Sequence, residues 1–345
     1  MSNLSVPLPK AFDAKVKDGK VYVESPKVMC VYSAESAYMT YEFLSLIESY
    51  VFDYNVGVTI SFENLEYFSA AASLLIFATV SKCQIGVKDH SKIEVLFPKN
   101  DAVLKLMASS GLKLALKQGG IAKVRKLIDS NNQYLSGSEV SIENYQKVLT
   151  ATLLNLDKHG VNFSNTKSQI FVKGMQEAIL NVKYHAYNDE FIRDFLLTKQ
   201  VKSKFSFHEE TGRGRWWQCC WHDVSNNKLI FIIYDDGEGI VNSIKRYYRN
   251  SPEHSDKLNL PDSTLLGNAM KLGVSRTGIK ERGKGSADII NTACTFPSSH
   301  LIVMSGLGHY RHDSAGINTT QLPFEIKGTL VQWVINYVEE NQDDI

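Results

Sequence analysis

Short apolar runs alternate with longer helical patterns in the first third of the chain. Three runs have the length and β-branched content of strands, and three segments between them carry helical periodicity: 28–32, 57–62 and 92–97 for the strands, and 41–51, 69–82 and 101–110 for the helices. Alternating strands and helices predict a sheet with helices packed against it. We therefore expect an α/β domain over residues 1–116.

The pattern weakens between residues 117 and 167, where Gly119-Gly120 and Asn131-Asn132 punctuate short helical segments. A second set of elements follows it: a helix at 168–186, a hairpin of 215–224 and 228–234, a helix at 286–292, and strands at 301–305 and 329–335. The sequence thus predicts a linker with helical segments over 117–167 and a second α/β domain over 168–345.

Composition narrows the class of protein. The 345 residues carry 38 basic and 37 acidic side chains, a net charge of +1, and no long run of one sign, which argues against a nucleic-acid-coating protein. The five cysteines form no C-x-x-C pair, as in a reduced compartment. The most apolar stretch, 68–80, is too short to cross a bilayer, and the N-terminus shows no apolar signal region. We expect a cytoplasmic protein that binds neither membrane nor nucleic acid.

Polar side chains recur every fourth residue along the helix predicted at 168–186. Glu177, Asn181 and His185 fall on one stripe, because residues four apart lie about 40° apart around an α-helix. A carboxylate, an amide and an imidazole in a row can hold a hydrated Mg²⁺ and polarise a water molecule. The same stripe also fits the solvent-facing side of an amphipathic helix.

An acidic, glycine-bearing loop follows the apolar strand 229–234. Gly237 and Gly239 let the backbone turn tightly and approach a flat ligand, and the Asp235 carboxylate can accept a hydrogen bond from an exocyclic amine. The alternative is a plain turn after a strand.

Two further glycine motifs lie closer to the C-terminus. Arg282-Gly283-Lys284-Gly285 opens the helix predicted at 286–292, and backbone N–H groups at such a helix start suit polyphosphate oxygens. Gly328-Thr329 stands at the entrance of the strand predicted at 329–335.

The order and spacing of these four motifs resemble the successive boxes of GHKL ATP-binding domains, over about residues 168–337. The helix motif, Glu177-Ala-Ile-Leu-Asn181-Val-Lys-Tyr-His185, is most similar to that of the anti-sigma-factor serine kinases. The resemblance implies the Bergerat fold, an α/β sandwich, with ATP and Mg²⁺ as its cofactors. One position departs from the family pattern, since Ser286-Ala287 stands where Gly-Leu is usual.

The same resemblance implies a role for each motif residue. Asp235 would bind the adenine amino group, Asn181 the Mg²⁺ ion, and Glu177 would orient or deprotonate the attacking nucleophile. The remaining expected contacts to the nucleotide comprise His185, Gly237, Gly239, Gly283, Gly285 and Thr329. Four basic side chains in or beside the expected ATP lid, 241–282, would compensate phosphate charge: Arg276, Lys280, Arg282 and Lys284.

The first domain resembles a STAS domain, on the strand, turn and helix from Val58 to Leu75 and on the segments 93–97 and 103–112. In that family the turn carries a serine that an anti-sigma-factor kinase phosphorylates. Ser69-Ala70-Ala71-Ala72 occupies the turn here, so alanine stands at the usual phosphoacceptor position and a conventional phosphoswitch is not expected.

Three functions remain open. The first is an ATP-dependent switch or ATPase coupled to the STAS-like domain, which Glu177 favours. The second is a serine protein kinase of the anti-sigma type, and the third is a non-catalytic adapter that a nucleotide stabilises. Each implies a protein partner, STAS-like or regulatory, and allows a homodimer. No phosphoacceptor motif of histidine kinases precedes residue 168, which argues against a self-contained sensor kinase.

Overall fold

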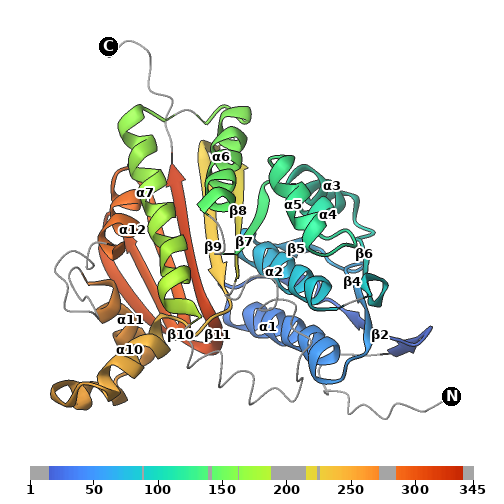
Figure 1. The fold of residues 1–345 in the computed structure, drawn as a ribbon, viewed down its shortest axis with the longest axis horizontal. Helices are drawn as coiled ribbons and strands as arrows, with labels where there is room; N and C mark the ends of the chain where they lie inside the picture. Colours follow the sequence, from blue (N-terminus) through green and yellow to red (C-terminus); the bar gives the residue numbers. More distant parts are fainter. Residues whose placement is uncertain are drawn as a thin grey trace. The chain divides into compact units, whose positions relative to one another are not determined.

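The computed structural model describes residues 15–87, 89–138, 142–161, 163–187, 215–223, 226–271 and 285–336. It is mixed α/β with several sheets, as the sequence predicts. The chain divides into two compact units, the first comprising Met1–Val124 and Lys199–Ser206 and the second Arg125–Thr198 and Phe207–Ile345. Figure 1 shows the elements of each unit along the sequence.

The first unit is built on a mostly parallel sheet of order β1-β2-β4-β6. Strands β2, β4 and β6 pair in parallel and β1 pairs antiparallel with β2, while β3 and β5 form a separate parallel pair. The bounds are Lys15–Lys17 (β1), Lys20–Glu24 (β2), Val28–Met29 (β3), Gly57–Ser61 (β4), Tyr67–Phe68 (β5) and Ile93–Leu96 (β6). Parallel pairing requires crossover connections, and the helices between the strands supply them.

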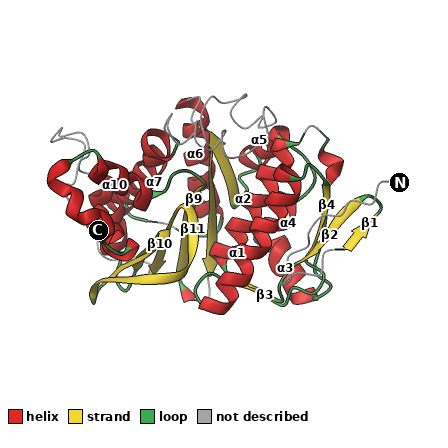
Figure 2. Cartoon of the chain, turned by 90° about the horizontal axis from the view of Figure 1, so that it is seen from below, coloured by secondary structure: helices red, strands yellow, loops and turns green. Residues whose placement is uncertain are grey.

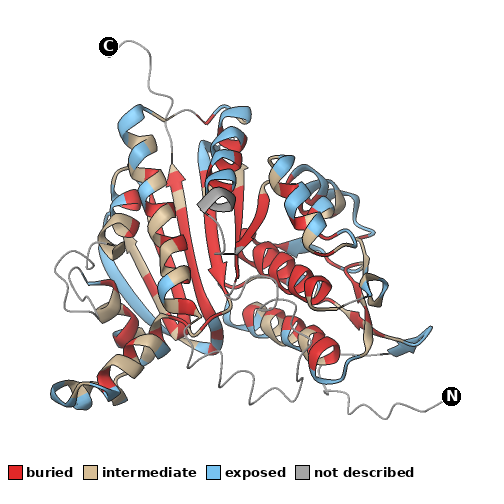
Figure 3. Ribbon diagram, in the orientation of Figure 1, coloured by how far each residue is buried: buried red, intermediate tan, exposed pale blue. Residues whose placement is uncertain are grey.

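Helix α2 is the most buried element of the first unit (Figure 3). It runs from Ala70 to Gly86, and its alanine-rich, all-round apolar sequence suits a helix without a solvent face. Its one buried cation, Lys82, forms an ion pair of 2.6 Å with Glu48 of α1. The helices of this unit are α1 (Ala34–Glu48), continued by a π-helical turn (Ser49–Asp53), α2, a 3-10 turn (His90–Lys92), α3 (Asp101–Ser109) and α4 (Leu112–Ala115), and α5 (Ile121–Asp129) crosses the division.

The second unit contains a fully antiparallel sheet of order β10-β11-β9-β8-β7. Its strands are β7 (Tyr134–Ser138), β8 (Arg215–Asp223), β9 (Lys228–Asp235), β10 (His300–Asp313) and β11 (Gly316–Asn336). Long β10 and β11 form a hairpin whose register shifts between Met304 and Gly308. Such bulges bend a strand and re-aim its side chains.

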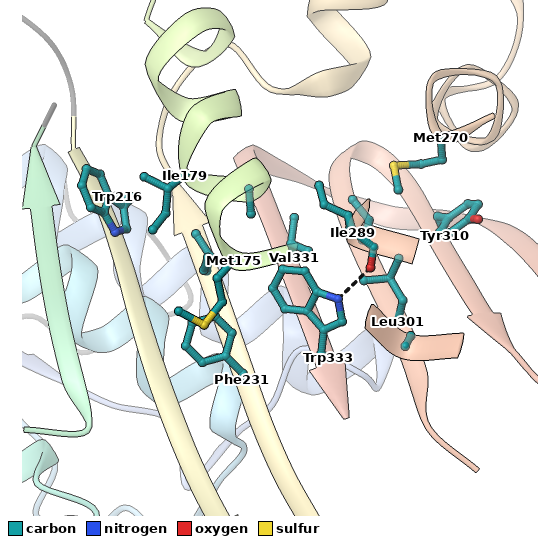
Figure 4. Packing of buried hydrophobic residues seen from close by; sticks show 14 of the residues in the cluster. Met175, Ile179, Trp216, Phe231, Met270, Ile289, Leu301, Tyr310, Val331 and Trp333 are labelled. Atoms are coloured by element: carbon teal, nitrogen blue, oxygen red, sulfur yellow. Dashed lines mark hydrogen bonds between the residues drawn. The ribbon is translucent and has the colours of Figure 1, made fainter. Parts of the chain in front are cut away.

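Helices cover one face of this sheet, as Figures 1 and 2 show. Their bounds are α6 (Ile142–Lys158), α7 (Asn165–Asn181), a π-helical turn (Val182–Ala186), α10 (Ile240–Arg249), a 3-10 segment (Pro252–Asn259), α11 (Asp262–Met270) and α12 (Gly285–Cys294). Met175 of α7 lies beside Phe231 of β9, Ile179 lies on the side of Trp216 of β8, and the Trp333 indole N–H donates to the Ile289 carbonyl of α12 at 2.9 Å (Figure 4). The alternating apolar residues of the strands thus form one core with α7 and α12.

The structure differs from the predicted domain boundaries in the stretch 117–167. β7 completes the edge of the second sheet and α6 packs in the same unit. The glycine and asparagine pairs that predict a linker instead flank short elements. Antiparallel pairing with β8 supplies the backbone hydrogen bonds of β7, and no local sequence pattern predicts that pairing.

A stacked histidine pair lies where the end of α6 meets β8. The rings of His159 and His222 are 4.4 Å apart, and Asn155 bonds to both, through its carbonyl to His159 at 2.8 Å and through its side chain to His222 at 3.0 Å. Burial and the neighbouring His159 lower the pKa of His222 to about 4. The native state therefore holds this ring neutral.

We expect acid to destabilise the protein through His222. The unfolded chain takes up a proton at His222 near pH 6.5, and the native ring does so only near pH 4. The free energy of unfolding therefore keeps its full value above pH 6.5 and falls as the pH drops between these values. Part of the ring stays in water, and we expect a loss of about 2 kcal/mol in the free energy of unfolding. Urea titrations at pH 7 and pH 4.5 check this: His222→Gln should flatten the difference, and parallel pH profiles of the two proteins would contradict it.

Among the described helices, none has the length and apolar character that crossing a bilayer requires.

Candidate functional site

The π-helical turn that follows α7 contacts the acidic loop that follows β9. The Glu238 N–H donates to the Ala186 carbonyl at 2.7 Å, and a Cβ atom on Gly237 would collide with that carbonyl oxygen. Only glycine therefore allows the loop backbone to lie against the helix end. This contact joins the first two motifs.

The loop also contacts the glycine that precedes Thr329. Gly239 has a φ of +78°, and a Cβ atom there would lie 2.6 Å from the Gly328 carbonyl oxygen. Gly328 has a φ of +67°, and its own Cβ would overlap the Asp235 carbonyl. Two glycines in left-handed conformation thus let the loop and β11 meet without side chains between them.

Asp235 lies at the centre of this crossing, at the C-terminal end of β9. Its backbone pairs with Thr329 of β11, and its buried carboxyl group accepts the Gly237 N–H at 2.9 Å. Burial raises the pKa of Asp235 to about 7, although hydrogen bonds from the Gly237 and Thr329 backbone amides oppose the shift. The carboxyl group is therefore positioned by its neighbours and titrates near neutrality.

Glu177 approaches the start of α12. A Cβ atom on Gly285 would lie 2.6 Å from the Glu177 Oε2 atom, so the carboxylate touches the glycine backbone. Burial, followed by the nearby Asp288, raises the pKa of Glu177. A half-buried carboxylate with a raised pKa is the usual state of a general base that must accept a proton.

The helix carrying Glu177 does not run on to His185 as an α-helix. It ends at Asn181, and Val182–Ala186 form a π-helical turn. The step of about 100° per residue that places His185 on the stripe of Glu177 and Asn181 does not hold past Asn181, because a π turn holds more residues. The place of His185 on the polar stripe therefore stays a prediction, and its ring lies 6.4 Å from that of Tyr184.

Several predicted nucleotide contacts lie outside the described residues: Arg276, Lys280, Arg282, Gly283 and Lys284. The earlier part of the expected lid, 241–271, consists of α10, the 3-10 segment and α11. An ion pair of 2.6 Å between Arg246 of α10 and Glu238 ties this part to the loop after β9.

Two positioning residues escape the sequence motifs. The Tyr187 hydroxyl donates to the Arg215 carbonyl at 2.8 Å and accepts the Asp236 N–H at 3.1 Å, which fixes the loop beside Asp235. Ser305 of β10 donates to the Gly328 carbonyl at 2.8 Å. Tyr187 lies two residues beyond the helix motif, and nothing local in the sequence marks Ser305, because its partners are more than twenty residues away.

Two side chains of α7 carry oxygen atoms that could serve as metal ligands. Glu177 and Asn181 offer the oxygen ligands that Mg²⁺ prefers, and the glycine backbones that meet at Asp235 and Glu177 leave no Cβ atoms between them. Within the described residues, no group of three or more His, Cys, Asp or Glu side chains could hold a metal ion. The arrangement can accept a hydrogen bond from an amine at Asp235 and a proton at Glu177.

Comparison with protein-family models and with curated proteins finds no match to this chain.

Proposed function

We propose that the second unit is a GHKL-type domain that binds Mg-ATP and acts as an ATPase or ATP-dependent switch. The main supporting observation is that segments far apart in the sequence meet. The loop after β9 contacts the π-helical turn after α7 and Gly328 within β11, and Glu177 of α7 approaches Gly285 at the start of α12. The antiparallel sheet with helices on one face supports the Bergerat fold.

Each motif residue has a task in this proposal. Asp235 accepts a hydrogen bond from the exocyclic amine of adenine, and Thr329 borders the base. Mg-ATP supplies the electrophilic γ-phosphoryl group, and Asn181 would hold the metal ion. Glu177 accepts the proton of the attacking water or hydroxyl group, and its raised pKa suits that role. Gly285 keeps its backbone close to this carboxylate.

The first unit supports a STAS-like partner domain. Its parallel strands β2, β4 and β6 alternate with helices, and Ser69 caps α2 by accepting the Ala72 N–H at 3.3 Å. The capping bond gives Ser69 a structural role, and alanine follows it where the family carries its phosphoacceptor. We therefore infer that the phosphoryl group goes to water, or to a separate partner, instead of this turn.

Calorimetry on the full chain tests nucleotide binding directly. We expect Mg-ATP and Mg-ADP to bind, and Mg-GTP to bind at least tenfold more weakly, because guanine presents an oxo group where adenine presents the amine. Equal affinity for GTP, or no binding of any of them, would contradict the proposal.

Labelled ATP then separates the three functions. Release of γ-labelled phosphate identifies an ATPase, and label on an added STAS-like protein identifies a kinase. Binding with neither reaction identifies an adapter.

A further inference from the structure

Helix α10 begins at a residue that has no side chain with which to cap it. Gly239 is its N-cap residue, and the first residues of any α-helix leave backbone N–H groups without a partner inside the helix. Serine, threonine, aspartate or asparagine usually satisfies one of them. Glycine is required here because a Cβ would lie 2.6 Å from the Gly328 carbonyl and 2.7 Å from the Ser305 hydroxyl.

The hydroxyl group of Ser305 lies where a local cap would be. Ser305 is fully buried in β10, and its Oγ atom accepts the Val241 N–H at 3.5 Å while it donates to the Gly328 carbonyl at 2.8 Å. One side chain thus bridges the first turn of α10 and the residue before Thr329.

The bulge in β10 is what aims Ser305 inward. The register of β10 against β11 shifts on both sides of Gly306, which has a φ of +57°. The Leu307 N–H within this irregular stretch donates to Asp262 of α11 at 2.9 Å, and Asp262 forms an ion pair of 2.7 Å with Lys245 of α10. The bulge is therefore held in place by α10 and α11.

We propose that Ser305 is a positioning residue of the nucleotide site, which caps α10 from a distant strand and sets the spacing between Gly239 and Gly328. This inference rests on the proposed function. Ser305 lies beside Gly239, in the loop after Asp235, and Gly328, next to Thr329. Its hydrogen bonds among the described residues go to Val241 and Gly328, and not to Glu177 or α12. It should therefore govern affinity for the nucleotide and not the chemical step.

The test compares Ser305→Ala with a matched serine. Ser299 is also buried, immediately before β10, and its hydroxyl accepts the Asn336 N–H at 2.9 Å, away from the site motifs. Each alanine variant removes one buried hydroxyl group, one within β10 and one immediately before it. Urea unfolding of both variants verifies that each remains folded under the conditions of the binding assay.

We expect Ser305→Ala to raise the Kd for Mg-ATP about tenfold, and KM by the same factor if the protein hydrolyses ATP, with kcat within twofold of wild type. Hydrogen exchange at the Val241 amide should be faster in nucleotide-free Ser305→Ala. Ser299→Ala should change neither the Kd for Mg-ATP nor the rate of hydrogen exchange at the Val241 amide. Ser305→Thr, which keeps the hydroxyl group, should restore part of the affinity.

Two outcomes would overturn the inference: wild-type affinity in Ser305→Ala, or an equal loss of affinity in Ser299→Ala. Absence of nucleotide binding by the wild-type chain is a different result and refutes the proposed function itself. Unchanged hydrogen exchange at the Val241 amide in Ser305→Ala would show that Ser305 does not cap α10, even if the affinity for Mg-ATP fell.

Discussion

Asp235→Asn is expected to lose at least a hundredfold in affinity for Mg-ATP. The asparagine Oδ1 atom can still accept the Gly237 N–H, which Asp235 accepts at 2.9 Å, so the loop keeps its conformation. The Nδ2 group then presents a donor to the amine of adenine, and two donors repel each other. The variant also loses a hydrogen bond to a charged acceptor, which contributes about 1.5 to 3 kcal/mol. Calorimetry with Mg-ATP measures the loss.

The same substitution should stabilise the nucleotide-free protein at alkaline pH. The pKa of Asp235 is raised to about 7, whereas an unfolded aspartate titrates near 4. The native state therefore keeps a proton that the unfolded chain has lost, and stability falls as pH rises through 7. We expect Asp235→Asn to unfold at a higher temperature than wild type at pH 8 and at nearly the same temperature at pH 4.

Asp236→Asn is the matched control. Asp236 is adjacent and half-buried, and its carboxylate accepts the Tyr234 hydroxyl at 3.3 Å. It should bind Mg-ATP within threefold of wild type. Full affinity in Asp235→Asn, or an equal loss in both variants, would refute the assignment of Asp235.

Glu177→Gln is expected to bind Mg-ATP as wild type does and to lose turnover by a factor of about 10² to 10⁴, the usual contribution of a general base. Glutamine keeps the shape that touches Gly285 but cannot accept the proton. Pre-equilibrium binding and phosphate release, measured on the same preparation, separate the two effects. Glu177→Ala should show the same separation.

The pH profile of turnover offers a second measure of Glu177. The Asp288 carboxylate contributes to the raised pKa of Glu177, so Asp288→Asn should shift the acidic limb of the profile to lower pH. Wild-type turnover in Glu177→Gln would exclude Glu177 as the base, and an unmoved limb in Asp288→Asn would exclude the coupling.

Sequence patterns were informative where a motif is carried by consecutive residues. The strand 229–234, the loop after it and the helix with Glu177 and Asn181 appear in the structure as β9, its acidic loop and α7. The convergence of these segments was expected only through the family resemblance, because periodicity alone says nothing of which strand ends meet.

Features that depend on distant partners escaped the sequence. The edge strand β7 has an ordinary, polar composition, and its pairing with β8 comes from residues eighty positions away. The π-helical turn at His185 likewise breaks an α-helical periodicity that the side chains alone would continue. The hydroxyl groups of Ser305 and Tyr187 bond to backbone N–H and carbonyl groups. Nearly every residue has such groups, so the sequence does not mark these partners.

The indole of Trp333 limits how α12 can move. Its bond to the Ile289 carbonyl lies one helical turn after Gly285, the residue that touches Glu177. Sliding of α12 along its axis would break the hydrogen bond to Trp333 and would also separate Gly285 from the Glu177 carboxylate. Rotation of the helix about Ile289 would keep the hydrogen bond to Trp333. A ligand group that presses on the start of α12 would therefore rotate the helix about Ile289 and would not slide it along its axis.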